Sequence, residues 1–136
     1  MSTRSNIGMQ HADGSITAIY VHWDGYPDHH VPILTEHYAT EDKVRALLAL
    51  GSLSSLAEDI GEKHDFDDHS EKFDSWCRAY GRDRGEDGTG PMTFPGEKEF
   101  NAYAVNDCAY LFKGGQWLAR EHSGAWTLAE SLLEVA

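Results

Sequence analysis

The chain has few cysteines and no long hydrophobic run. Cys77 and Cys108 do not form a CxxC pair, and two such thiols in a cytosolic protein are expected to be buried and reduced. No apolar stretch approaches the roughly 18 residues of a membrane span, and the N-terminal residues MSTRSNIGMQ lack the apolar region of a secretory signal. These features predict a cytoplasmic protein that does not associate with a membrane.

Basic residues are also scarce. The sequence has 11 Lys and Arg against 23 Asp and Glu, which gives a formal net charge of −12. Binding to a nucleic-acid backbone depends on clustered Lys and Arg that displace counterions. We therefore expect no direct nucleic-acid binding. The acidity would suit a partner with a basic groove, although it would equally serve solubility alone.

A chain of 136 residues fits a single domain, here residues 1–136, and is long enough to bury a proper core. Two segments within it have unusual composition. Residues 58–74 carry eight carboxylates against two lysines, and such blocks are usually solvated. Residues 81–96 contain five glycines and two prolines, which predicts a long loop.

Turn residues and alternating apolar positions predict two β-hairpins. Segments 5–10 and 16–21 flank Asp13-Gly14, and segments 109–112 and 116–120 flank Gly114-Gly115. Alternation over 100–105 indicates a further strand.

Helical spacing and capping residues predict four or more helices. The first follows Asp28 and places Ile33, Leu34, His37 and Tyr38 on one face, and the second begins after Thr40 and buries Val44, Leu47 and Leu48. Capping boxes at 55–58 and 127–130 predict two more, the last with Leu128, Leu132 and Val135 inward, and Phe73 to Tyr80 suggests another. The sequence thus predicts an α+β domain with an antiparallel sheet of about four to five strands and helices packed on one face.

The stretch 21–38 concentrates chemically capable side chains. Trp23 and Tyr26 offer flat faces for a base or a sugar, while His22 and Asp24 offer hydrogen bonds. The alternative is that Trp23 and Tyr26 anchor the core and Asp24-Gly25 forms a turn.

A second candidate site follows Tyr80-Gly81. Arg82 and Arg84 present planar guanidinium groups that match phosphate or carboxylate, which suggests an anion clamp. The alternative is an internal salt-bridge network that ties this loop to Asp24 or Glu86.

Metal binding and catalysis receive less support from the sequence. Two groups contain the residue types that bind metals: the first is His22, Asp24, His29, His30 and His37, and the second is the 64–69 cluster. No HExxH motif occurs, however, and zinc needs about three ligands in fixed geometry. We therefore predict no cofactor. Asp24 with His22 or His37 could form a general acid–base pair, so an enzyme remains an alternative.

Several motifs resemble a group of small proteins of tailed bacteriophages and prophages. They are MSTRSNIG, HWDGYP, LTEHY, ALGSLSSL, YGRDRGE and YLFKGGQW, and together they span most of the chain. The resemblance implies a phage accessory protein that acts in the bacterial cytoplasm, but it implies no mechanism. The acidic segment 58–74 has no counterpart in it.

Three functional hypotheses follow. The first is a binding protein that counters a host process, above all a defence system, by sequestering a nucleotide-like ligand. In this version Trp23 and Tyr26 stack on the base, and Arg82 and Arg84 hold phosphate. The predicted ligand-binding residues are His22, Trp23, Asp24, Tyr26, His37, Tyr80, Arg82 and Arg84.

The second hypothesis is an acidic mimic of nucleic acid, in which segment 58–74 occupies the basic groove of a host nuclease or effector protein. The third is a small metal-assisted hydrolase that uses His22, Asp24 and His37. The partner would be a nucleotide-like small molecule or a host protein. An open edge of the sheet would also allow a homodimer.

Overall fold

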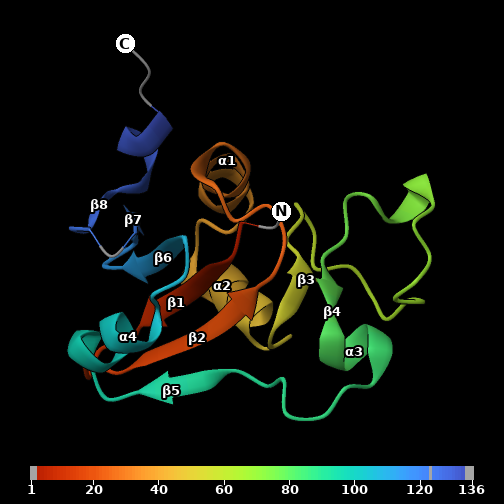
Figure 1. Ribbon diagram of the computed structural model, residues 1–136, viewed down its shortest axis with the longest axis horizontal. Coiled ribbons are helices and arrows are strands. Elements are labelled where there is room, and N and C mark those ends of the chain that lie inside the picture. Colours follow the sequence, from red (N-terminus) through yellow and green to blue (C-terminus); the bar gives the residue numbers. More distant parts are fainter. Residues whose placement is uncertain (1–2, 123, 134–136) are drawn as a thin grey trace.

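The computed structural model describes residues 3–122 and 124–133, over which the chain folds as an α+β domain with a mixed sheet (Figure 1). Its strands are β1 (Ser5–Gln10), β2 (Ile16–Val21), β3 (Leu53–Ser55), β4 (Arg78–Ala79), β5 (Met92–Phe94), β6 (Cys108–Lys113), β7 (Gln116–Glu121) and β8 (Thr127–Leu128). Its α-helices are α1 (Pro27–His37), α2 (Glu41–Leu48), α3 (Tyr80–Arg84) and α4 (Glu97–Tyr103). A short 3₁₀ helix, η1 (Glu71–Phe73), lies between β3 and β4, and a second, η2 (Ala129–Leu133), follows β8.

The strand order is β4-β3-β2-β1-β6-β7-β8, and β5 pairs with the first half of β2. Both predicted hairpins are confirmed, since β1 pairs antiparallel with β2, and β6 with β7. The prediction of a purely antiparallel sheet of about four to five strands is wrong. β1 lies parallel to β6, and β2 parallel to β3, so the sheet is mixed and has eight strands over the described residues.

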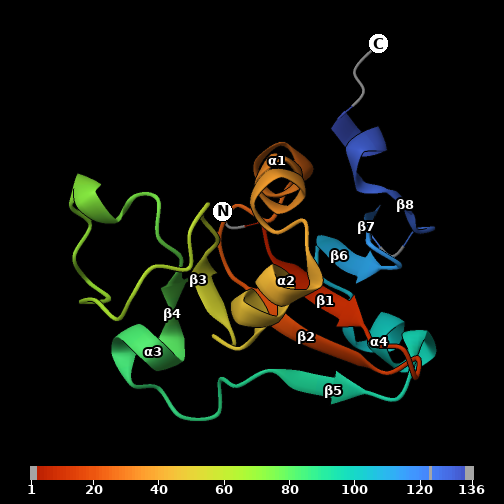
Figure 2. The same cartoon turned by 180° about the vertical axis from the view of Figure 1, so that it is seen from behind.

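Helices cover both faces of the sheet, so the prediction of helices on one face is also wrong. α1 and α2 pack over one face, and α4 packs over the other, as the opposite views in Figures 1 and 2 show. Segment 100–105 was expected to be a strand, but it mostly belongs to α4. Phe100 and Ala104 are buried four residues apart while Ala102 is exposed, and this is a helical spacing.

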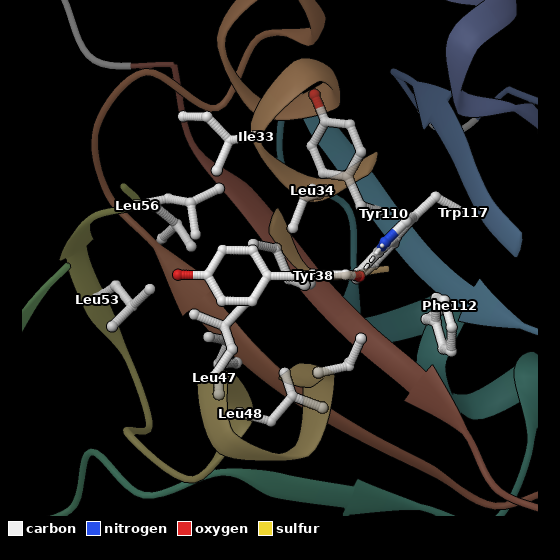
Figure 3. Close-up of a cluster of buried hydrophobic side chains, with 14 of the residues drawn as sticks. Ile33, Leu34, Tyr38, Leu47, Leu48, Leu53, Leu56, Tyr110, Phe112 and Trp117 are labelled. Atoms are coloured by element: carbon white, nitrogen blue, oxygen red, sulfur yellow. Dashed lines mark hydrogen bonds between the residues drawn. The ribbon is translucent and has the colours of Figure 1, made fainter. Parts of the chain in front are cut away.

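The larger core lies between the sheet and the helices α1 and α2 (Figure 3). The Trp117 indole N–H donates to the Tyr38 carbonyl oxygen at 2.8 Å, and the Tyr38 hydroxyl donates to the Ala57 carbonyl oxygen at 2.8 Å. These hydrogen bonds pair buried polar groups that would destabilise the fold if they were left without a partner. Ile33 and Leu34 of α1 enter this core as predicted, whereas His37 at the end of the helix is exposed.

The helix expected after Thr40 is confirmed as α2. The Thr40 side chain accepts a hydrogen bond from the Lys43 backbone N–H, and Val44, Leu47 and Leu48 are buried. None of the helices described in residues 3–122 and 124–133 is long and apolar enough to cross a bilayer.

Three shorter predictions are wrong. The segment expected to be a capped helix at 55–58 begins within β3, whose Leu53 pairs with Val21 and Ala79. Residues 73–80 lead into β4, and the expected loop 81–96 contains most of α3 and all of β5. For the three strands, pairing with a distant part of the chain outweighs a weak local signal.

The C-terminal prediction is partly corrected as well. Thr127 and Leu128 pair with β7, so the chain stays extended where a capping box was expected, and Leu128 is exposed. A 3₁₀ helix follows, and Leu132 is partly buried against the core. Val135, also expected to face inward, lies outside the described residues.

Candidate functional site

The loop between β2 and α1 is held firmly by backbone hydrogen bonds. The Trp23 N–H donates to the Ser54 carbonyl oxygen at 3.0 Å, and the Gly25 N–H donates to the Thr3 carbonyl oxygen at 2.8 Å. The buried Tyr110 hydroxyl donates to the Gly25 carbonyl oxygen at 2.7 Å. Asp24 between them has a left-handed backbone with φ of +57°. The loop therefore presents its side chains from a fixed backbone.

Trp23 and Tyr26 point out of this loop instead of anchoring the core. Trp23 is 47% exposed and Tyr26 is 42% exposed, which excludes the alternative that both are core residues. The His22 ring packs edge-on against Trp23, with 4.8 Å between centroids, and its Nδ1 lies 2.8 Å from the Tyr20 hydroxyl.

The backbone of the acidic segment 58–74 is hydrogen-bonded to Arg78, a buried residue of β4. It extends beyond β3 and β4 in Figures 1 and 2. The Arg78 guanidinium donates to the carbonyl oxygens of Asp65 (3.3 Å), Phe66 and Asp68 (2.9 Å). Most carboxylates of the segment are exposed: Glu58, Asp59, Glu62, Asp65, Asp67, Glu71 and Asp74. The backbone thus turns inward towards a cation while the carboxylates face solvent.

A cavity of about 350 Å³ separates the Trp23 loop from the end of the acidic segment. Its aromatic walls are Trp23, Phe73 and Trp76, and its carboxylates are Asp24 and Asp74. The remaining lining residues are His29, Ser54, Ser55, Leu56, Ala57, His69 and Arg78. Here two of the predicted site residues, Trp23 and Asp24, meet the acidic segment.

A buried chain of polar groups runs inward from the cavity wall. His29 Nδ1 lies 2.9 Å from His30 Nδ1, and His30 Nε2 lies 3.1 Å from the Ser5 hydroxyl. Burial lowers the pKa of His30 to about 3, with a smaller contribution from His29. His30 is therefore neutral at pH 7 and has one N–H and one lone pair. The tautomer of His30 sets the direction of hydrogen bonding between His29 and Ser5.

The Arg82 guanidinium is engaged inside the protein. It donates to Asp83 Oδ1 at 2.9 Å and to the carbonyl oxygens of Ile60 at 2.6 Å and Cys77 at 2.9 Å. Burial raises the pKa of the Asp83 carboxyl, but hydrogen bonds from Arg82 and from the Ala79 and His64 amides outweigh it and hold that pKa below its ordinary value. Asp83 and Arg82 thus form an internal network that fixes α3.

Arg84 forms an ion pair with Glu86, and its guanidinium lies 4.6 Å from the Phe66 ring centroid and 4.7 Å from that of Tyr80. Neither Arg82 nor Arg84 lines the Trp23 cavity. The structure therefore brings together His22, Trp23, Asp24 and Tyr26 on one loop and Tyr80, Arg82 and Arg84 at another place.

His37 belongs to neither group, because it lines a separate cavity of about 490 Å³ with Tyr38, Glu58 and Asp59. Among the residues that the structure describes, no three His, Cys, Asp or Glu side chains are grouped as metal ligands would be. His22, Asp24 and His37 therefore do not form the ligand set that a metal-assisted hydrolase would need.

Of the lining residues, only Trp23 and Asp24 were predicted to bind a ligand, and among those given no such role are Phe73, Trp76 and Arg78. One signal was present, because Phe73 and Trp76 are aromatic residues at the end of a strongly acidic block that offers them little apolar company. Their position against Trp23 depends on backbone pairing. The Asp59 N–H donates to the Ser75 carbonyl oxygen at 2.9 Å, and the Cys77 N–H donates to the Asp59 carbonyl oxygen at 2.8 Å.

Comparisons of the chain with protein-family models, with curated proteins and with solved structures find no match. Its function is therefore inferred from its own geometry and charge.

Proposed function

We propose that this chain is a binding protein, and not an enzyme, which covers a basic surface of another protein with its acidic segment 58–74. The observation that carries the proposal is the cavity at Trp23, where the exposed Trp23 ring, the partly buried rings of Phe73 and Trp76, and carboxylates from two segments meet at the surface. Aromatic anchors surrounded by charged groups are typical of protein interfaces. The cavity gives the acidic segment a point of contact that a merely solvated face would lack.

The distribution of charge supports a basic partner. Arg78 and Arg82 direct their guanidinium groups to carbonyl oxygens and to Asp83, inside the protein. The exposed carboxylates of the same region face solvent, and Asp59 and Asp65 accept hydrogen bonds from backbone N–H groups of the segment itself. A protein of net charge −12 attracts a basic surface over a distance of about 8–10 Å at moderate ionic strength.

The resemblance to phage proteins supports a bacterial host protein as the partner. A host nuclease, or an effector of a defence system, has a basic groove in which exposed carboxylates would take the place of phosphates. Occupation of that groove would block the host process without any chemistry by this chain.

Capture of a nucleotide-like ligand has weaker support. It requires Trp23 and Tyr26 to face Arg82 and Arg84 across one site, but the two arginines donate to groups elsewhere in the protein. The carboxylates Asp24 and Asp74 beside Trp23 would also repel phosphate. This hypothesis stays a prediction.

Two variants of equal net charge test the proposal. The first neutralises the acidic segment by Glu62→Gln, Asp67→Asn and Glu71→Gln. The control neutralises three exposed carboxylates elsewhere by Glu36→Gln, Glu99→Gln and Glu121→Gln. Each immobilised protein is exposed to bacterial lysate at about 50 mM and about 200 mM salt, a range over which contacts of this kind weaken steeply. Captured proteins are identified by mass spectrometry, purified and titrated against all three proteins.

We expect the wild-type chain and the control to bind a basic protein at low salt and to lose it at higher salt. The segment variant should bind that purified protein at least tenfold more weakly. Equal binding by the two variants, or the absence of any basic protein among those captured, would contradict the proposal.

A further inference from the structure

The cavity between Trp23 and Trp76 combines flat aromatic faces with negative charge. Phe73 and Trp76 pack with ring centroids 5.3 Å apart, and the half-exposed Trp23 indole lines the same cavity. Asp24 and Asp74 complete these walls. We propose that the cavity receives one arginine side chain of the basic partner, an inference that rests on the function proposed above.

The charges in and around the cavity favour a cation. Within the described ranges 3–122 and 124–133, neither Asp24 nor Asp74 forms an ion pair with a basic side chain. Two positive charges oppose a cation there. Arg78 in the wall points its hydrogens to carbonyl oxygens of the acidic segment, and Lys72 Nζ lies 5.0 Å from the Phe73 ring centroid. A cation that enters the cavity is attracted by both carboxylates and by the half-exposed Trp23 indole, because the Phe73 ring is already stacked on His64.

Arginine fits these walls better than lysine does. Its guanidinium is planar, so it can stack on an indole and donate two parallel hydrogen bonds to a carboxylate at the same time. It is also more weakly hydrated than an ammonium group, which lowers the free energy needed to remove it from water. The volume of about 350 Å³ lies at the lower end of the range for ligand pockets, as expected for one long side chain.

The probe for this site is N-acetyl-arginine amide, and its matched control is N-acetyl-citrulline amide, a neutral molecule of nearly the same shape. Each is titrated into ¹⁵N-labelled protein at equal ionic strength, and the indole N–H signals of the tryptophans are followed by NMR. Trp117 and Trp126 serve as internal references, because their N–H groups donate to the Tyr38 carbonyl oxygen and to Asn101 Oδ1.

We expect arginine amide to shift the indole signals of Trp23 and Trp76 in a saturable way and to leave those of Trp117 and Trp126 in place. Citrulline amide should produce no shift at the same concentration. Asp74→Asn should weaken the arginine amide response several-fold, whereas Asp87→Asn, an exposed change outside the cavity, should not. Equal shifts with citrulline amide would overturn the inference, and an equal response to N-acetyl-lysine amide would overturn the choice of arginine.

Failure of this inference and failure of the proposed function give different results. If the purified basic partner binds the wild-type chain and Trp23→Ala equally, and the segment variant still loses it, the partner uses the acidic segment without the cavity. The inference then falls, and of the proposed function the binding of a basic surface by the acidic segment stands without the cavity. If no basic protein binds at all, the proposed function falls, and with it the claim that the arginine belongs to a partner.

Discussion

Replacing Gly61 with alanine should destabilise the protein more than the same change at Gly88. Both glycines have a left-handed backbone, with φ of +67° and +75°, so alanine brings a similar backbone penalty of about 1–2 kcal/mol at each position. A Cβ at Gly61 would lie 2.4 Å from Cγ and Cδ2 of Trp76, whereas nothing lies within 4 Å of a Cβ at Gly88. Overpacking of this kind adds about 1–3 kcal/mol.

The expected losses in the free energy of unfolding are therefore about 2–5 kcal/mol for Gly61→Ala and about 1–2 kcal/mol for Gly88→Ala. Urea denaturation followed by far-UV circular dichroism measures both values. The indole N–H signal of Trp76 should also move in Gly61→Ala and stay in place in Gly88→Ala. Equal destabilisation by the two changes would refute the packing of Trp76 against Gly61, and with it the position of one cavity wall.

Three further predictions concern the buried groups. Because burial lowers the pKa of His30 from 6.5 to about 3, the unfolded chain takes up a proton more readily below pH 6.5. The free energy of unfolding should thus fall as the pH drops, by about 2–3 kcal/mol more between pH 7 and 4.5 in the wild type than in His30→Gln, and parallel pH profiles from urea denaturation would refute this. Burial raises the pKa of Cys77 and raises that of Cys108 to about 11. Neither thiol should therefore react with Ellman's reagent at pH 8 until urea is added, and rapid reaction of the native protein would contradict this prediction. Leu34→Ala should lower the free energy of unfolding by about 2–5 kcal/mol, because Leu34 is buried, and Leu128→Ala should lower it by less than about 0.5 kcal/mol, because Leu128 is exposed. Similar losses for the two variants in urea denaturation would contradict the buried position of α1.

Elements with strong local signals could be predicted from the sequence. The first hairpin turns at Asp13-Gly14 and the second at Gly114-Gly115, and all three glycines adopt the positive φ that such turns need. The helix after Thr40 has a cap and a buried stripe that are both visible within ten residues. In these places neighbouring residues along the chain already determine the structure.

The arrangement of the sheet could not be predicted, because it depends on distant pairings. Nothing near β1 or β6 indicates that the two lie parallel, with Ser5 beside Cys108. β3, β4, β5 and β8 have two or three residues each, too few for a period-2 pattern. These strands form because a partner strand is already in place.

The candidate site shows the same limit. Trp23 and Asp24 could be identified from the composition of their loop. Phe73 and Trp76 are about 50 residues away in the sequence, and only the folded chain places them in the same cavity. Arg82 was predicted to bind an anion because no role was assigned to Asp83, the next residue in the sequence. In the structure Asp83 is buried and accepts hydrogen bonds from Arg82. Whether an adjacent pair of opposite charges faces inward or outward is decided by burial, which one sequence does not reveal.

The central claim is that the acidic segment and the Trp23 cavity together bind a basic surface. Its most direct test is a titration with a six-arginine peptide at about 50 mM salt, followed by tryptophan fluorescence. Wild-type protein and the control with Glu36, Glu99 and Glu121 neutralised should bind the peptide equally and lose it as salt rises. The variant with Glu62, Asp67 and Glu71 neutralised, and Trp23→Ala, should both bind at least tenfold more weakly. If all four proteins bind the peptide with the same affinity, the net charge alone explains binding and the claim is wrong.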